Sequence, residues 1–260
     1  MTLIYHMKTF RLIISKPASA ADNMALDAKI FSGYLEDGMP VLRLYRWQAP
    51  AFTYGFSQVP ESQIDLPACA VDGVEAAKRI TGGGILFHDD EITYSFVCSK
   101  SDVGEAPGVL VDYRNICGFL LRFYESLGLT AAFALSQAGF KDRCAPHELC
   151  SAAHEKYDIV IGGKKIGGNA QKRNRQAIFQ HGSIPCGINW NFARKYLKFL
   201  PNDLSAYATT LSDELKVVPE KDILEEKLIE AFARTFNVNF SKKPGDGSIF
   251  TTVIPVKTGI

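Results

Sequence analysis

The chain has 260 residues and a formal net charge of +1, so it is long enough for one sizeable domain and lacks the basic excess of a nonspecific nucleic-acid binder. Its six cysteines are dispersed, which is typical of free thiols in a reducing cytosol. The apolar residues of the first ten positions are interrupted by His6 and Lys8, too soon for a signal core or a membrane span. We therefore expect a cytoplasmic protein with no nucleic-acid or membrane partner.

The first quarter of the chain predicts strands around one helix. Residues 9–16 read as a strand, and a helix is expected to begin near Asn23 with Asp22 as its N-cap. Two β-prone runs follow, at 41–47 and 51–57. The short break between them predicts a hairpin or a bent strand pair.

A glycine-rich loop comes next and is the most distinctive local feature. Gly82, Gly83 and Gly84 follow Arg79 closely, and without Cβ atoms they let the backbone approach a ligand. The alternation over residues 92–97 predicts a half-buried strand that supports this loop. Taken alone, the same glycines also fit a simple turn between two strands.

The second half of the chain predicts two amphipathic helices around an irregular region. Apolar residues recur at helical spacing from position 116 to Gly128, and again over 219–235, where Ile223 is part of the stripe. Residues 131–156 are expected to be irregular. The last twenty residues are expected to be poorly packed.

The dipeptide Gly162-Gly163 predicts a two-residue hairpin turn between β-prone runs. In that register Lys165 lies opposite Val160 and on the same face as Asp158. Lys165 is therefore the lysine of this hairpin that is placed for a polar role.

Four residues with metal-binding or nucleophilic side chains crowd one segment: Cys144, His147, Cys150 and His154. In one hypothesis Cys150 is a nucleophile that takes an acyl group as a thioester, with Lys165 lowering its pKa. In a second, the four side chains bind zinc. In a third, Cys150 is simply a small buried hydrophobe.

Several motifs occur in a fixed order: KRITGGGILFHD, TYSF, YDIVIGGKKIGGNAQ and IFQHGSI. With the helix at 23–27 and the RLYRW segment, they resemble the catalytic domain shared by lipoate-protein ligase A, the octanoyltransferases and the biotin-protein ligases. The resemblance runs from about Arg11 to about Leu211. It implies an α+β fold with a central mixed or antiparallel sheet flanked by helices. We assign residues 1–240 to this domain and 241–260 to a poorly structured tail.

The same resemblance implies roles for individual residues. In such proteins the Arg-x-x-Gly-Gly-Gly loop holds the acyl chain or its activated form, and the lysine of the Lys-Ile-x-Gly-x-Ala motif contacts the acyl carbonyl. Lys165 carries over as that catalytic lysine. The implied substrate-binding residues are Arg79, Gly82, Gly83, Gly84, His88, Asn169, His181 and Gly182.

One group of octanoyltransferases places its nucleophilic cysteine seven residues before an aromatic residue that opens the lysine hairpin, and Cys150 stands seven before Tyr157. We therefore predict an acyltransferase that attaches an octanoyl or lipoyl group through a Cys150 thioester, with Lys165 as activator. The implied donor is octanoyl-acyl carrier protein. The implied acceptors are lipoyl domains of 2-oxoacid dehydrogenases or the glycine cleavage H protein. This route requires no cofactor and no metal.

Two alternatives remain at this point. The first is a lipoate-protein ligase that uses ATP and Mg²⁺ and forms a lipoyl-adenylate, in which Cys150 is incidental. The second is a non-catalytic protein that binds lipoylated domains, with zinc at the cluster over 144–154. Biotin ligation fits the lysine and His-Gly-Ser strands less well.

Overall fold

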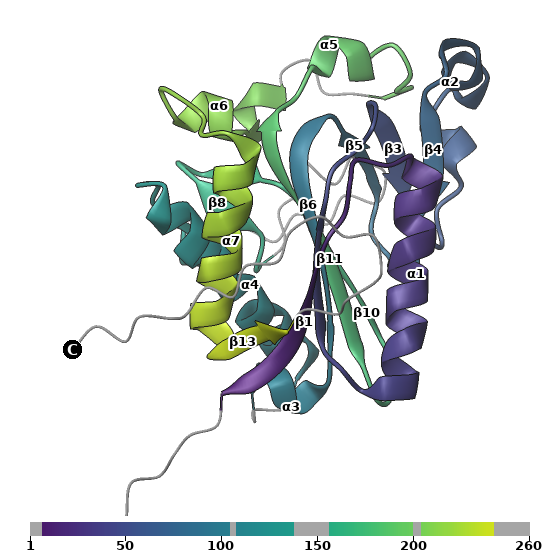
Figure 1. Ribbon diagram of the computed structural model, residues 1–260. Helices are drawn as coiled ribbons and strands as arrows, with labels where there is room; N and C mark the ends of the chain where they lie inside the picture. The colour runs from purple at the N-terminus through teal and green to yellow at the C-terminus, as the bar shows by residue number, and fades with distance from the viewer. Residues whose placement is uncertain (1–6, 105–107, 138–155, 200–203, 242–260) are drawn as a thin grey trace, which may run out of the picture.

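A six-stranded mixed sheet forms the centre of the fold (Figure 1). The computed structural model describes residues 7–104, 108–137, 156–199 and 204–241. In spatial order the strands of the sheet are β10 (Asn169–Arg173), β11 (Ile178–Gly187), β6 (Asp90–Cys98), β2 (Val41–Tyr45), β1 (Lys8–Ile14) and β13 (Val238–Ser241). The pairs β1–β2 and β1–β13 are parallel and the others antiparallel, so the predicted α+β class with a mixed central sheet is confirmed.

Helices cover both faces of this sheet (Figure 1). The α-helices are α1 (Ala20–Asp37), α2 (Leu66–Asp72), α3 (Lys100–Val103), α4 (Val109–Ser126), α5 (Trp190–Ala193), α6 (Leu211–Glu214) and α7 (Lys221–Phe236), and the 3-10 turns are η1 (Pro60–Ser62), η2 (Ala134–Ser136) and η3 (Leu204–Ala206). Helix α1 lies on one face, and α4 and α7 pack together on the other. The layers therefore run helix, sheet, helix.

The period of two along β6 decides which side chains meet which helix. Tyr94 and Phe96 point to the α4/α7 face, where Phe96 packs edge-on against Phe232 with ring centroids 4.8 Å apart. Thr93 and Ser95 point to the opposite face, toward carboxylates behind the cavity described below. The prediction that this strand is half-buried is wrong, because helices cover the sheet on both sides and residues 91–98 are all buried.

Helix α1 begins earlier than the sequence predicted. Its N-cap is Ser19, whose hydroxyl oxygen accepts a hydrogen bond from the backbone N–H of Asp22, so Asp22 lies in the first turn and is not the cap. The helix ends at Gly38, whose φ of 64° is the left-handed conformation that glycine adopts without strain.

Helix α1 also carries buried polar residues toward the sheet. The guanidinium of Arg43 on β2 pairs with Asp27 at 2.7 Å and donates to the side-chain oxygen of Asn23 at 2.7 Å. Because all three side chains are buried, these contacts fix α1 on the sheet in one position.

The two β-prone runs at 41–47 and 51–57 form neither a hairpin nor a bent strand pair, so that prediction is wrong. The first run gives β2 of the central sheet, and the second gives β3 (Ala51–Tyr54) of a separate three-stranded sheet. In that sheet β3 lies between β4 (Glu75–Lys78), which is parallel to it, and β5 (Ile85–His88), which is antiparallel. The glycine loop connects β4 to β5 and therefore lies at the end of this small sheet.

A third sheet carries the predicted lysine hairpin. Its strands, in spatial order, are β12 (Ala208–Thr209), β9 (Lys164–Ile166), β8 (Ile159–Ile161) and β7 (Ala131–Phe133). Gly162 and Gly163 form the turn with φ of 57° and 82°, and Val160 pairs with Lys165, so the predicted register is confirmed. Residues 131–133 are a strand, although the sequence predicted irregular structure there.

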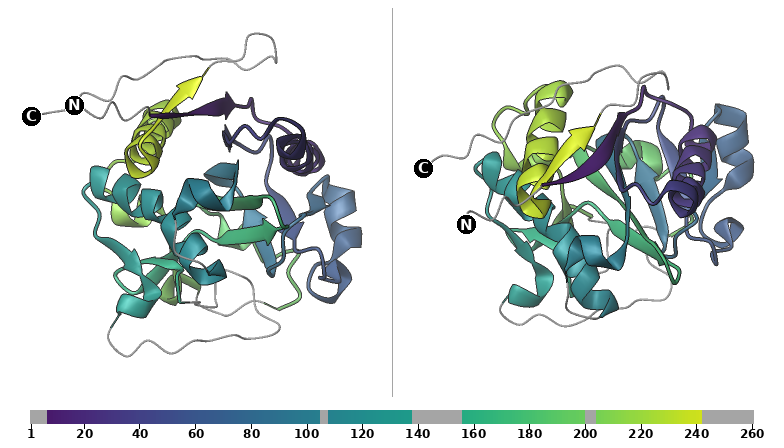
Figure 2. Two further views of the ribbon diagram at one scale, coloured as in Figure 1. Left: turned by 90° about the horizontal axis from the view of Figure 1, so that it is seen from below. Right: turned by 60° about the horizontal axis from the view of Figure 1, so that its bottom comes forward.

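The two ends of the described chain meet in the central sheet. Strand β13 pairs in parallel with β1, and both views of Figure 2 show them side by side. Strand β13 extends to Ser241, the first residue of the predicted tail, and residues 242–260 lie outside the described part. In α7, Leu224, Leu228 and Phe232 are buried as predicted, but Ile223 is exposed and so does not belong to the packed stripe. No helix within the described residues has the length and apolarity needed to cross a bilayer.

Candidate active site

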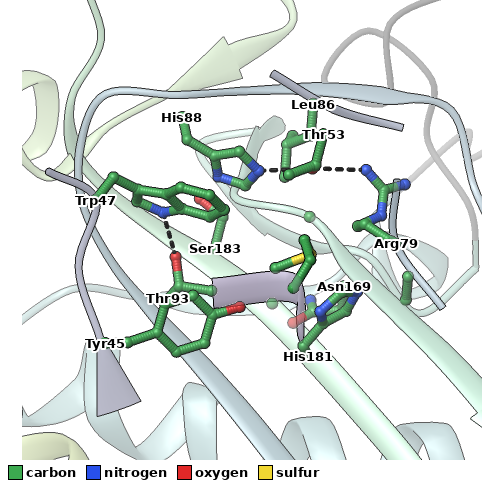
Figure 3. Close-up of a pocket in the computed structure, with 14 residues that line it drawn as sticks. Tyr45, Trp47, Thr53, Arg79, Leu86, His88, Thr93, Asn169, His181 and Ser183 are labelled. Carbon is green, nitrogen blue, oxygen red and sulfur yellow. Dashed lines mark hydrogen bonds between the residues drawn. The ribbon is translucent and has the colours of Figure 1, made fainter. Parts of the chain in front are cut away.

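A cavity lies between the α1 side of the central sheet and the small β3 sheet (Figure 3). Including its open mouth it encloses about 370 Å³. Its lining residues are Met24, Tyr45, Trp47, Thr53, Arg79, Leu86, His88, Thr93, Gly168, Asn169, Ala170, His181, Gly182 and Ser183. Five of the eight predicted substrate-binding residues line it: Arg79, His88, Asn169, His181 and Gly182.

Arg79 holds the glycine loop from within. One terminal nitrogen of its guanidinium donates to the hydroxyl oxygen of Thr53 at 2.8 Å, and the other donates to the carbonyl oxygens of Gly82 and Gly84 at 3.2 and 2.7 Å. In a trans peptide the N–H points away from the preceding C=O, so turning these carbonyls toward Arg79 directs the following N–H groups away from it. The described contacts of Arg79 therefore order the loop.

The chain at Gly55 contacts the glycine loop at Gly83, and glycine is required at both positions. A Cβ on Gly55 would stand 2.1 Å from the carbonyl oxygen of Gly83, which is far inside van der Waals contact. Gly83 itself has φ of 94°, in the region that favours glycine. The chain just after β3 therefore lies in close contact with the glycine loop.

His88 belongs to a buried hydrogen-bonded chain that ends on Arg79. Its Nδ1 lies 2.9 Å from Glu91, and its Nε2 lies 2.7 Å from the hydroxyl of Thr53. The ring also stacks on Trp47 with centroids 3.9 Å apart. Because a carboxylate only accepts, Nδ1 is the donor, and in the neutral ring Nε2 accepts from Thr53. Thr53 then presents its oxygen to Arg79, as the dashed lines in Figure 3 show.

Glu91 is the carboxylate behind this part of the wall. It accepts from Trp47 Nε1 at 2.9 Å, from Ser183 at 2.6 Å and from the hydroxyl of Thr93. Burial by itself would raise the pKa of Glu91, but its interaction with His88 and the hydrogen bonds from the two hydroxyls hold that pKa below its usual value. Glu91 is therefore ionised at neutral pH.

His181 forms a second hydrogen-bonded chain, similar to that of His88, on the other side of the cavity. Its Nδ1 lies 3.3 Å from Asp27, and its Nε2 lies 2.8 Å from the hydroxyl of Thr81, just before the glycine loop. Burial lowers the pKa of His181 despite the opposing effect of Asp27, so its ring is neutral at pH 7. The pKa of Asp27 would be raised by burial, but His181 and Arg43 bring it below its usual value.

Asn169 and Gly182 are paired across β10 and β11 at one end of the cavity. The side-chain oxygen of Asn169 accepts from the hydroxyl of Tyr94 at 2.8 Å. A Cβ on Gly182 would stand 1.9 Å from that oxygen, so Gly182 is what makes room for Asn169. This contact accounts for the glycine of the His-Gly-Ser strand.

Lys165 lies on the neighbouring sheet and is not one of the cavity-lining residues. Its Nζ is 2.7 Å from Asp158, and both side chains are about 95% buried. The predicted shared face of these two residues is confirmed. In this conformation the lysine is therefore held by the carboxylate immediately before strand β8 of its own hairpin.

The predicted nucleophile lies outside the described residues, as do Cys144, His147 and His154. The structure therefore tests neither the thioester nor the zinc hypothesis for that segment, and no metal-binding cluster occurs among the residues it describes. The other four cysteines are all free and buried, and burial raises the pKa of each thiol: Cys69, Cys98, Cys117 and Cys186. None of these four has the thiolate character of a nucleophile.

Sequence reasoning missed the two carboxylates. Asp27 and Glu91 were not predicted as site residues, although each accepts hydrogen bonds from side chains that line the cavity. A signal was present, since Glu91 follows the HDD of the glycine motif and Asp27 lies in an otherwise apolar stretch of helix. The sequence does not indicate which hydrogen-bond donors these two carboxylates contact.

A mixed-sheet domain with a cavity beside a glycine loop, lined by apolar and polar side chains, has the features of a protein that binds a small ligand. The chain matches the family described as the lipoyl protein ligase A/B catalytic domain over residues 19–237. It belongs to that family, so the predicted family and the prediction of an enzyme are confirmed.

Relatives of known name agree with this assignment. The chain is 33% identical over 252 residues to octanoyltransferase LipM of Kyrpidia tusciae, covering 92% of this chain and 91% of the relative. It is 34% identical over 200 residues to octanoyltransferase LipM of Geobacillus kaustophilus, covering 75% and 72%.

The fold is also that of solved structures. A putative lipoate protein ligase of Thermoplasma acidophilum with bound lipoic acid superposes with a TM-score of 0.73 at 24% identity, covering 90% of this chain and 89% of the other. A lipoate-protein ligase A bound with ATP gives the same score and identity, covering 90% and 88%. At this identity the likeness establishes the fold.

Proposed function

We propose that this protein is an octanoyltransferase that moves an octanoyl group from octanoyl-acyl carrier protein to one lysine of a lipoyl domain. The observation that carries the proposal is the similarity to octanoyltransferase LipM, because it spans 92% of this chain and 91% of the relative. The acceptors we propose are lipoyl domains of 2-oxoacid dehydrogenases or the glycine cleavage H protein, and the compartment we propose is the cytoplasm.

The cavity supports an acyl ligand. Met24, Leu86 and Trp47 provide apolar surface, and each methylene buried there contributes about 0.8 kcal/mol. The ordered glycine loop lies beside this surface, held by Arg79. This apolar surface supports the proposal of an acyl ligand.

The proposed chemistry has two acyl-transfer steps. The thiolate of Cys150 attacks the carbonyl carbon of the donor thioester, so a new carbon–sulfur bond forms and the carrier thiol leaves. The ε-amine of the acceptor lysine then attacks the Cys150 thioester, which forms the amide and returns the thiol. In this scheme Lys165 supplies positive charge to the thiolate and to the developing oxyanion.

This route uses neither ATP nor a metal, because the donor thioester is already activated. The ligase alternative differs in this respect, since free lipoate must first be activated with ATP and Mg²⁺. The buried, protonated thiols of Cys69, Cys98, Cys117 and Cys186 do not compete with Cys150 for the role of nucleophile.

Intact-protein mass spectrometry tests the proposal. The protein and an apo lipoyl domain are incubated either with octanoyl-acyl carrier protein alone or with lipoate, ATP and Mg²⁺. We expect an octanoyl adduct on the protein and ATP-independent modification of the domain, both lost in Cys150→Ala. Cys144→Ala, in the same segment, is the matched control and should retain both.

Modification of the domain only with ATP, unaffected by Cys150→Ala, would overturn the thioester mechanism and make the protein a ligase. Modification in neither mixture would favour a protein that only binds lipoyl domains.

A further inference from the structure

Several residues that line the cavity carry polar groups, although the ligand proposed for it is a saturated chain. Hydroxyl, indole and imidazole groups of Tyr45, Trp47, Thr93, His88 and Ser183 line it (Figure 3). A saturated chain cannot accept a hydrogen bond, so a wall donor directed at the chain would lose its partner when the chain displaces water. The direction of these donors therefore decides whether such a chain is tolerated.

Glu91 takes up the donors on one side of the wall. It is 2% exposed, lies behind the lining residues, and accepts from Trp47 Nε1, His88 Nδ1 and the hydroxyls of Thr93 and Ser183. All four of these groups belong to cavity-lining residues, and all four turn their hydrogens away from the cavity toward one carboxylate.

Asp27 likewise accepts hydrogen bonds from donors on the other side of the cavity wall. The hydroxyl of Tyr45 donates to it at 3.0 Å, and His181 Nδ1 lies 3.3 Å from it. The Nε2 atoms of His181 and His88 are turned toward the hydroxyls of Thr81 and Thr53. These wall groups thus present lone pairs, ring faces and carbon to the cavity.

We infer that Glu91 is a specificity-determining residue that acts through the wall, by drawing its donors away from the cavity so that a lining that includes polar side chains accepts a saturated chain. The inference rests on the proposed octanoyltransferase function. It predicts selection against chains that place a hydrogen-bond acceptor beside Trp47, His88, Thr93 or Ser183, because Glu91 engages the donors of these four residues.

The test compares octanoyl-acyl carrier protein with carriers of oxa-octanoyl chains, in which an ether oxygen replaces one methylene at successive positions. The ether is nearly isosteric and only accepts hydrogen bonds. The readout is the ratio of kcat/KM for octanoyl to kcat/KM for each oxa-octanoyl chain. Glu91→Gln places an amide N–H₂ beside Ser183 and so releases the serine hydroxyl to donate into the cavity. We expect the ratio to fall about 3- to 10-fold for the chain whose oxygen lies nearest Ser183.

Two further variants separate this effect from a general disturbance. Glu225→Gln on α7 removes another buried carboxylate, whose hydrogen-bond partner is Arg46 and not a cavity-lining residue, and should leave the ratio unchanged. In the double variant Glu91→Gln/Ser183→Ala the released donor is gone, so the octanoyl preference should return.

Ser183→Ala alone keeps the inference testable if Glu91→Gln fails to fold. We expect an unchanged ratio, because the deleted hydroxyl already points away from the chain. A ratio that rises in Ser183→Ala, or one that does not change in folded Glu91→Gln, would overturn the inference while leaving the proposed function intact. Absence of octanoyl transfer by the unsubstituted protein would instead overturn the proposed function.

Discussion

Replacement of Gly55 by alanine probes the contact that shapes the glycine loop. The new Cβ would stand 2.1 Å from the carbonyl oxygen of Gly83 and 2.9 Å from the carbonyl carbon of Gly82. Both neighbours are backbone atoms, so the loop or β3 must move by about 1 Å to restore contact distance. Overpacking of this kind costs about 1–3 kcal/mol. If the shift also breaks one hydrogen bond from Arg79 to the loop, the loss grows by about 1.5–3 kcal/mol.

Urea unfolding followed by circular dichroism measures this loss of stability, and octanoyl transfer at a temperature where the variant is folded measures the effect on the loop. Gly33→Ala is the matched control, because a Cβ there meets nothing within 4 Å and the residue lies inside α1. That variant should gain about 0.5–1 kcal/mol and keep its activity. A Gly55→Ala protein as stable and as active as the unsubstituted one would refute the reasoning about the loop.

Three further outcomes are expected. Asp158→Asn should lower the free energy of unfolding by about 3–5 kcal/mol, since it leaves the buried ammonium of Lys165 without its charged partner, and Asp158→Asn/Lys165→Met should recover part of the loss in the same urea assay. The free energy of unfolding should decrease in two windows as the pH is lowered. The pKa of His181 is lower in the folded protein, so the unfolded chain binds that proton first, below about pH 6.5. The pKa of Asp27 is also lower in the folded protein, which adds a loss of stability below about pH 4. Unfolding at a series of pH values checks this, and His181→Gln should remove the upper window; an unchanged upper window would contradict the assignment. The native protein, treated with iodoacetamide at neutral pH and analysed by peptide mass spectrometry, should show no modification of the four buried thiols of Cys69, Cys98, Cys117 and Cys186. Rapid labelling of any of these thiols would contradict their raised pKa values.

The sequence by itself determined the features that depend on near neighbours. Helical spacing located α4 and α7, and the Gly162-Gly163 turn fixed the register that places Lys165 opposite Val160, because a two-residue turn leaves one antiparallel pairing. The glycine, lysine and His-Gly-Ser motifs, in that order along the chain, were sufficient to predict the family.

Only the tertiary structure decided which groups meet across the chain. The two adjacent β-prone runs belong to different sheets. Strand β2 pairs with β1 and β6, whereas β3 pairs with β4 and β5. Asp27 meets His181 across 154 positions, and no local pattern records such a contact. The direction in which a hydroxyl or imidazole donates depends on the acceptor that packing places beside it. For that reason the roles of Asp27 and Glu91 became visible only when the sheet and α1 were seen together.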